Sequence, residues 1–307
     1  MDKIDSSTTS LSTTDYAHSF QRENLLIKLW INSFPSKNTQ DVYSRYLKLF
    51  TITMKVQSLR DVRTSHINVY LRMMLATKSQ KTVSLYKAVL GSAFSYLESV
   101  DYIQVNPIAK AMKVSVPKNG IYKIFSVENS KQIIDAAHAQ DKAMMIFLYF
   151  TMARISELIN LTMADIIVDT NWATIKIRGK GGKLRRVKIP IEVYCKAMDA
   201  LYEERSKISN GVINPNDPLF ISSRHTKLSR SQTWRRYKGV IKAAGLPSQI
   251  APHWSRHSAV THVLKRGASL KATSEMAGHE SIEVTAWYQN IDDETPPSSY
   301  LSAGISD

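Results

Sequence analysis

The sequence predicts a mainly α-helical protein of two domains, an α+β fold in which a small β-sheet or hairpin interrupts the second domain. Three observations predict it. The 307 residues are enough for two hydrophobic cores. Apolar residues recur at helical spacing along most of the chain, whereas residues 173–177 and 185–189 alternate as strands do. A stretch with proline and glycine at 113–124 indicates a linker between the domains.

The first domain, residues 18–112, is expected to be a compact bundle of four short helices. Residues 1–17 are rich in serine and threonine, which predicts a disordered tail before it. Asn106-Pro107 ends the region because the residue before a proline avoids the helical conformation. The apolar stripes predict helices at about residues 18–34, after a cap at Ser36 or Asn38, at 65–76 and at 80–100.

The second domain, residues 125–290, is expected to be mostly helical around its hairpin, with a tail at 291–307. Ser126 can cap a first helix that runs to about residue 139, and a strongly apolar helix is predicted over 142–161. Residues 179–183 join the two strands as a flexible tip. Later helix boundaries are predicted at Pro252, Gly267, Ser269, Gly278 and Ser281.

The composition indicates a polyanionic partner. The chain has 41 Lys and Arg against 26 Asp and Glu, a formal net charge of +15, and such an excess most often serves nucleic acid. The alternatives are a merely basic protein and, more weakly, one that binds acidic membrane surfaces without a long basic anchor. Two basic runs are predicted to contact phosphates, unless they are ordinary solvated faces: Lys183, Arg185 and Arg186, and Arg230, Arg235 and Arg236.

Several classes of protein are disfavoured. No stretch approaches the roughly 18 apolar residues of a membrane span, and the first residues lack the pattern of a secretory signal. The single cysteine, Cys195, rules out an intramolecular disulfide and a thiolate cluster for zinc. A reducing, cytoplasmic location is therefore expected.

Two arginines lie in settings that suit phosphate binding. Arg154 and Glu157 are three residues apart in an apolar run, so we predict that they share a helix face and that the carboxylate orients the guanidinium. A surface ion pair is the alternative. His253 and Arg256 lie at a predicted helix start, where free backbone N–H groups also favour a phosphate. A basic, solvated turn is the alternative there.

A late tyrosine completes a constellation for phosphodiester chemistry. Tyr288 follows His279 on the last predicted helix, and its hydroxyl can attack phosphorus while Arg154 and Arg256 hold the oxygens. Taken alone, such a tyrosine more often packs in a core or an interface. Tyr300 is a rival, but it lies in the predicted tail.

These residues stand in motifs that resemble those of the tyrosine recombinases, the family of phage integrases and Xer proteins. Residues 154–158 match its R-[IV]-S-E-L run, and 179–183 match its G-K-G-x-K hairpin tip. Residues 253–257 match its H-x-L-R-H motif with Ser255 in place of leucine, and 278–288 match its G-H-x(8)-Y spacing. Each motif alone is weak, but together and in this order they are highly specific.

The resemblance covers most of residues 18–290, with two departures near the motifs. Met152-Ala153 precedes the first arginine where the family usually has glycine and then a larger aliphatic residue. Ala277 stands where leucine often precedes Gly278. These departures bear on local packing. The first domain is similar to the family's core-binding domain at Thr39, Tyr43, Phe50, Thr82, Leu90, Phe94, Tyr96 and Asn106-Pro107.

The resemblance implies a four-helix core-binding (SAM-like) bundle followed by a mixed, mostly helical tyrosine-recombinase catalytic domain. Tyr288 would be the nucleophile and would form a 3′-phosphotyrosyl link. His253 would accept its proton and contact the phosphate, and Lys180 would donate a proton to the departing 5′ oxygen. No cofactor, metal or ATP is expected, because arginines supply the charge stabilisation and one phosphodiester is exchanged for another. The residues that stabilise the phosphorane would be Arg154, Arg256 and His279, supported by Glu157 and His257.

The resemblance also implies partners. These are double-stranded DNA at paired recombination sites and further copies of the chain, as a dimer or tetramer that works through a Holliday junction. The tail at 291–307 would dock on a neighbouring protomer. No membrane is expected, the protein would be cytoplasmic and nucleoid-associated, and an accessory protein is left open.

Because the segment 1–17 is short, an arm-binding domain is not expected. This favours a two-domain Xer-like recombinase, resolvase or mobile-element integrase over a lambda-type enzyme. Strand relaxation like that of a type IB topoisomerase and a non-catalytic DNA-binding regulator are the alternatives. Strand exchange between two sites would exclude the first, and a comparison with Tyr288→Phe would test the second.

Overall fold

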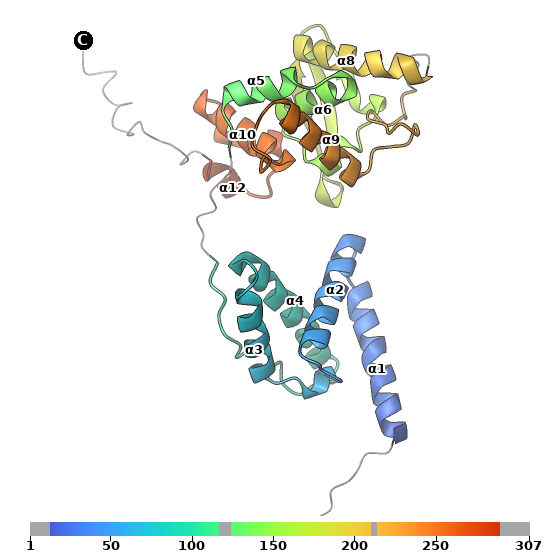
Figure 1. Cartoon of the computed structure of the whole chain (residues 1–307), viewed down its shortest axis with the longest axis vertical. Coiled ribbons are helices and arrows are strands. Elements are labelled where there is room, and N and C mark those ends of the chain that lie inside the picture. The colour runs from blue at the N-terminus through green and yellow to red at the C-terminus, as the bar shows by residue number, and fades with distance from the viewer. Residues whose placement is uncertain (1–12, 117–123, 210–213, 289–307) are drawn as a thin grey trace, which may run out of the picture. The chain divides into compact units, whose positions relative to one another are not determined.

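The computed structural model describes residues 13–116, 124–209 and 214–288 (Figure 1). The chain divides into two compact units, Met1–Gly120 and Ile121–Asp307, and the division falls within the stretch predicted as the linker. Each unit has a hydrophobic core of its own. In the described part of the chain, no helix is long and apolar enough to cross a membrane.

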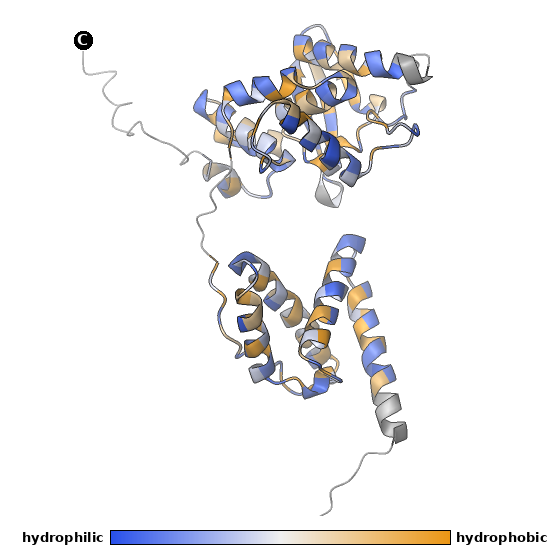
Figure 2. Ribbon diagram, in the orientation of Figure 1, coloured by the Kyte–Doolittle hydropathy of each residue, from blue (hydrophilic) through white to orange (hydrophobic). Residues whose placement is uncertain are grey.

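The first unit is the predicted four-helix bundle. Its core contains large side chains such as Trp30, Phe50 and Tyr70, and Figure 2 shows hydrophobic and hydrophilic residues interspersed along its helices, as amphipathic packing requires. Ser79 begins the last helix, because its hydroxyl accepts a hydrogen bond from the Thr82 N–H. The elements are α1 Thr13–Asn32, α2 Lys37–Thr53, the 3₁₀ turn η1 Leu59–Asp61, α3 Thr64–Leu75 and α4 Gln80–Ser99.

A buried carboxylate fastens α1 to this bundle. Glu23 accepts hydrogen bonds from the Ser58 hydroxyl at 2.7 Å, the Leu59 N–H at 2.9 Å and the Tyr102 hydroxyl at 2.7 Å. It therefore joins α1 to the connection before α3 and to the chain that follows α4. The helix begins at Thr13, so the disordered tail predicted over 1–17 is too long; residues 1–12 lie outside the described part.

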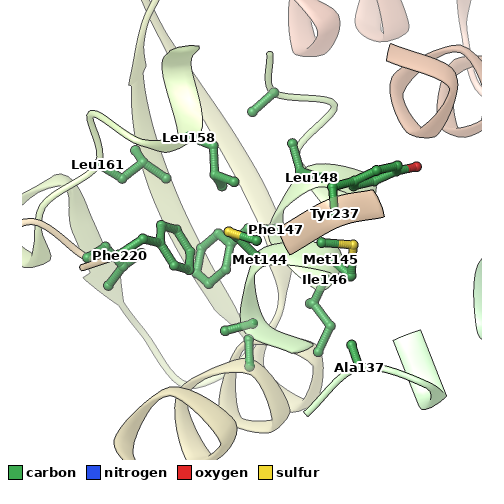
Figure 3. Packing of buried hydrophobic residues seen from close by; sticks show 14 of the residues in the cluster. Ala137, Met144, Met145, Ile146, Phe147, Leu148, Leu158, Leu161, Phe220 and Tyr237 are labelled. Atoms are coloured by element: carbon green, nitrogen blue, oxygen red, sulfur yellow. The ribbon is translucent and has the colours of Figure 1, made fainter. Parts of the chain in front are cut away.

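The second unit is a mostly helical domain with a small antiparallel sheet in the order β1-β2-β3. Its central helix, α6, contacts α5, α8, α9 and α10. On α6, Phe147 packs edge-to-face against Phe220 with 6.0 Å between ring centroids (Figure 3). The elements are α5 Val127–Asp135, α6 Ala139–Phe150, α7 Ile155–Leu158, η2 Met163–Asp165, β1 Ile166–Val168, β2 Trp172–Arg178, η3 Lys180–Gly182, β3 Leu184–Pro190, α8 Ile191–Ser209, α9 Arg230–Ala243, α10 Pro252–Lys265, α11 Leu270–Ala277 and α12 Ile282–Ala286.

The structure corrects three sequence-based boundaries. The helix predicted over 142–161 is two helices, α6 and α7, because Met152 adopts a left-handed φ of 53° and turns the chain between them. The helix predicted after Ser126 ends at Asp135. Strand β1 is missing from the prediction because three residues are too few to show an alternating pattern.

The boundaries predicted around the late motifs are confirmed. Pro252 lies in the first turn of α10, and Ser269 caps α11 through the Ala272 N–H. Gly267 and Gly278 follow the ends of α10 and α11 with φ of 86° and 65°, a conformation that glycine adopts without a Cβ penalty.

Candidate active site

Arg154 and Glu157 form the first part of the site. Arg154 is the N-cap of α7, so it precedes this short helix and does not share a helix face with Glu157 as predicted. The side chains still meet. Glu157 Oε1 accepts a hydrogen bond from Arg154 Nη1 at 2.8 Å, and Oε2 accepts one from the Arg154 backbone N–H at 2.9 Å. The Glu157 side chain is 4% exposed and that of Arg154 is 36% exposed, so a buried carboxylate holds an arginine that a ligand can reach.

Glu157 is ionised despite its burial. Burial alone would raise the pKa of its carboxyl group, but hydrogen bonds from Arg185 and Arg154 outweigh this effect and hold the pKa below its ordinary value. The carboxylate therefore binds two arginines at once, one on each side.

Arg256, near the start of α10, is 2% exposed. Its Nη1 donates a hydrogen bond to the Met152 carbonyl at 2.6 Å, and its buried Nη2 has no hydrogen-bond partner among the described residues. Burial and the nearby Arg154 lower the pKa of Arg256 to about 10, which leaves it charged at neutral pH. A buried cationic donor without a partner is costly unless an anion binds it.

Three histidines gather around Tyr288. The Tyr288 hydroxyl is hydrogen-bonded to His257 Nδ1, and the His279 ring stacks on the tyrosine ring with 5.9 Å between centroids. His253 packs on His257 with 4.8 Å between ring centroids. Tyr288 lies just beyond α12, not within the last helix as predicted, and is 3% exposed.

These histidines are neutral at physiological pH. Burial, reinforced by Arg256, lowers the pKa of His279 to about 4, and burial, reinforced by His253, lowers that of His257 to about 4. Burial and Arg256 also lower the pKa of His253. Each neutral imidazole has one nitrogen that accepts a hydrogen bond or a proton.

Lys180 lies on the loop between β2 and β3, in η3. Its side chain lies outside the described part of the structure. Gly181 and Gly182 in this loop have φ of 72° and 75°, which a residue with a side chain rarely adopts. At the base of the loop, a pocket of about 360 Å³ is lined by residues that include Arg154, Gly179, Lys183, Arg185 and His279.

The six residues predicted as phosphate contacts fall into two groups. Arg185 pairs with Glu157 at 2.8 Å and Arg236 with Asp141 at 2.5 Å. These two are therefore engaged within the protein, which favours an internal role for them over the predicted DNA contact. The other four are exposed: Lys183, Arg186, Arg230 and Arg235.

One exposed aromatic residue on α9 is absent from the sequence-based prediction. Trp234 is 45% exposed, and the Lys238 ammonium lies 5.1 Å from its ring centroid. The exposed Arg230 and Arg235 are on the same helix. An exposed tryptophan among basic side chains suits nucleic acid, and it could have been found by combining helical spacing with residue type.

Comparison with known proteins decides the family. The model of the phage integrase family matches residues 123–295, more than half of the chain. The chain belongs to the phage integrase family. The tyrosine recombinase XerC of Thermodesulfovibrio yellowstonii is 30% identical over 285 residues, which cover 89% of this chain and 92% of that protein. XerD of Listeria monocytogenes is 29% identical over 282 residues, with 88% and 93% covered.

Solved structures of a site-specific recombinase and of an integrase share the fold. The XerH recombinase in a post-cleavage complex with its palindromic difH substrate has a TM-score of 0.71 at 18% identity, with 98% of this chain and 90% of XerH covered. A lambda integrase dimer bound to a COC′ core site has a TM-score of 0.69 at 17% identity, with 94% and 84% covered. The prediction of a tyrosine recombinase, a DNA strand-transferring enzyme, is confirmed, and the two alternatives are not favoured.

Proposed function

We propose that this recombinase cleaves DNA by attack of Tyr288 on a phosphodiester and rejoins it by the reverse reaction. The new bond joins the tyrosine oxygen to phosphorus, the bond to the 5′ oxygen breaks, and a 3′-phosphotyrosyl link and a 5′-hydroxyl result. The observation that carries the proposal is the position of Tyr288, which is hydrogen-bonded to His257 on α10. The same helix carries Arg256, whose buried Nη2 has no partner among the described residues. The same reaction with a second duplex exchanges strands.

Arg154 and Arg256 supply the charge that the phosphorane needs. Attack on phosphorus builds negative charge on the non-bridging oxygens, and removal of one preorganised donor typically lowers the rate by a factor of about 10² to 10³. His279 adds a neutral donor: if its Nδ1 accepts the 2.7 Å hydrogen bond from the Thr285 hydroxyl, its Nε2 carries the proton and can donate to the phosphate.

His257, not His253, is our candidate for the proton of Tyr288. The sequence resemblance assigned that proton to His253, but the hydrogen-bond partner of the tyrosine hydroxyl is His257 Nδ1. A tyrosine has a free pKa of about 10, so it must lose its proton to a neighbour as it attacks. His253 keeps the proposed contact with the phosphate, next to Arg256 on α10.

Lys180 is our candidate for the proton that the departing 5′ oxygen takes up. Its place on a glycine-containing loop beside the pocket that Arg154 and His279 line supports this role. The other proposed DNA contacts are Lys183, Arg186, Arg230 and Arg235.

We further propose that the enzyme works on two duplex sites as a tetramer through a Holliday junction, in the cytoplasm and on the nucleoid. The XerC and XerD relatives match over both units, which supports a two-domain, Xer-like enzyme. The lambda integrase structure holds a dimer on its core site, which supports assembly on DNA. Docking of the tail at 291–307 on a neighbouring copy and a requirement for an accessory protein stay proposals; that tail lies outside the described residues.

The test begins with a search for the binding site. The Tyr288→Phe variant, which cannot form the covalent link, selects bound fragments from genomic DNA, and nicked, labelled duplexes carrying the selected site are then incubated with the wild-type protein. We expect a 3′-linked adduct on a denaturing gel that Tyr288→Phe does not form. Tyr202→Phe, which alters an exposed tyrosine on α8, is the matched control and should form it. Tight binding without an adduct in the wild type would contradict the proposal.

A further inference from the structure

Arg185, on β3, contacts two other segments of the second unit. Its Nη2 donates a hydrogen bond to Glu157 Oε2 at 2.8 Å, and its Nε donates one to the Met276 carbonyl at 2.9 Å. Its guanidinium also lies against Gly278, where a Cβ atom would come within 3.1 Å of it. The Arg185 side chain is only 11% exposed.

Each of these contacts joins Arg185 to a residue that holds, or lies next to, a residue with a role in the proposed reaction. Glu157 holds Arg154 through two hydrogen bonds. Met276 is in the last turn of α11, directly before the Gly278 turn that carries His279. Arg185 itself lies on the strand that leaves the loop of Lys180. A single guanidinium thus joins segments that are 28 and 91 residues away along the chain.

We propose that Arg185 is a positioning residue that sets the separation between the Arg154 pair, the His279 turn and the Lys180 loop. This proposal rests on the roles proposed above for those residues. Arginine is needed because its planar fork makes the Nε and Nη2 contacts at once, in two directions, whereas a lysine has one ammonium to place. The alternative is the DNA contact that the sequence predicts, in which Arg185 acts on binding and not on the chemical step.

Gly278 is the other half of this arrangement. It adopts a φ of 65°, and an added Cβ would meet the Cδ and Nη1 atoms of Arg185 at 3.1 Å. A residue with a side chain would therefore strain the turn and push on the guanidinium. The glycine before His279 is required by the packing of Arg185 as well as by backbone conformation.

The test separates binding from chemistry. With the nicked duplex described above, DNA affinity is measured by gel shift, and the rate of adduct formation is measured at saturating protein in a single turnover. Arg185→Lys is compared with Lys188→Ala, which removes an exposed positive charge from the same strand. We expect Arg185→Lys to bind DNA as the wild type does and to form the adduct about 100-fold more slowly, the typical effect of a displaced catalytic group. Lys188→Ala should form it at the wild-type rate.

A second substrate tests the connection to the Lys180 loop. When the departing 5′ oxygen is replaced by sulfur, the tyrosine oxygen bonds to phosphorus and the P–S bond breaks to release a thiolate. This leaving group needs no proton from Lys180. We expect the thio substrate to restore part of the rate of Arg185→Lys. If it restores none, the connection to the loop is wrong.

Two outcomes would overturn the proposal as a whole. One is an Arg185→Lys protein with a wild-type rate at saturation and weakened binding, which would make Arg185 a DNA contact. The other is a wild-type rate together with wild-type binding. If Arg185→Lys does not fold, Arg185→Gln, which keeps hydrogen-bond donors on a stem, is measured in the same way. Failure of the wild type to form any adduct would instead refute the proposed function.

Discussion

Replacement of Glu157 by glutamine would probe the centre of the site while keeping its shape. The carboxylate is 4% exposed and accepts three hydrogen bonds, two from Arg154 and one from Arg185. Glutamine has nearly the same volume, but it lacks the negative charge and places an NH₂ group where one of the oxygens accepts. Two guanidiniums would then lose their counter-ion, with the buried Arg256 close by.

The expected cost follows from this geometry. Removal of one partner from a buried ion pair typically costs about 3–5 kcal/mol. In a unit of this size, each kcal/mol lowers the melting temperature by about 2–4 °C. Glu157→Gln should therefore lower the melting temperature of the second unit by about 6–20 °C. It should also slow adduct formation, because Arg154 loses the group that orients it.

The dependence on pH gives a sharper signature. The pKa of folded Glu157 lies below its ordinary value of 4.5, because the hydrogen bonds from Arg185 and Arg154 outweigh burial. The unfolded chain therefore takes up the proton first as the pH falls. The stabilisation is present above about pH 4.5 and is lost as the pH falls through the folded pKa. In Glu157→Gln this part of the acid destabilisation should be absent.

The histidines act in a different pH window. His257 and His279 have a folded pKa of about 4 against 6.5 unfolded, so stability falls between these values as the pH is lowered. That loss should be the same in both proteins. Urea unfolding between about pH 3 and pH 8 resolves the two effects. Equal melting temperatures and superimposable curves below pH 4.5 would refute the reasoning.

Three other substitutions test single residues. Gly278→Ala should slow adduct formation in the wild-type background, and it should do so less in an Arg185→Ala background, where the added methyl group has room. Equal effects in the two backgrounds of this double-mutant cycle would contradict the contact. In salt titrations of DNA binding, Arg230→Ala should reduce the slope of the logarithm of affinity against the logarithm of salt concentration by about one. Arg236→Ala, which breaks the ion pair with Asp141, should leave this slope unchanged. Met152→Gly should relieve a backbone strain of about 1 kcal/mol at the φ of 53°, but it removes a buried side chain whose loss costs about 2–5 kcal/mol. Urea unfolding should therefore show a lower free energy of unfolding. A higher one would contradict the packing.

Elements whose cause is local were predictable from the sequence. The four helices of the first unit follow from apolar spacing. The start of α10 follows from Pro252, and the ends of α10 and α11 follow from Gly267 and Gly278, whose positive φ needs glycine. These signals lie within a few residues of the feature that they determine, so one sequence is enough to read them.

The partners within the site were not predictable in the same way. The hydrogen bond from Arg185 to Glu157 spans 28 residues, and that between His257 and Tyr288 spans 31. The charge of Arg185 suggested a contact with DNA. The sequence does not show which arginine pairs with a buried carboxylate. The break before Arg154 was hidden too, since Met152 adopts a conformation that its residue type disfavours.

Met152, where the helix is interrupted, and Ala277, which departs from the family pattern, lie in the same part of the core. Both residues are buried in a small cluster with Ala259, Val260 and Tyr288. A methionine in place of glycine adds side-chain volume to this cluster, and an alanine in place of leucine removes volume from it. Volume-conserving changes are the ones that cores tolerate best. The two departures therefore change the side-chain volume of this cluster in opposite directions.

The charges of the site bear on the proposed mechanism. Arg154, Arg185 and Arg256 contribute three positive charges and Glu157 one negative charge, while the surrounding histidines are neutral. These four side chains together have an excess of two positive charges, and Lys183 and Glu280, which line the pocket, add one charge of each sign. A phosphodiester carries one negative charge, and the phosphorane that forms on attack carries close to two. Because only interactions that strengthen in the transition state accelerate a reaction, this excess of positive charge supports the proposed attack of Tyr288, since it would stabilise the phosphorane more than the phosphodiester.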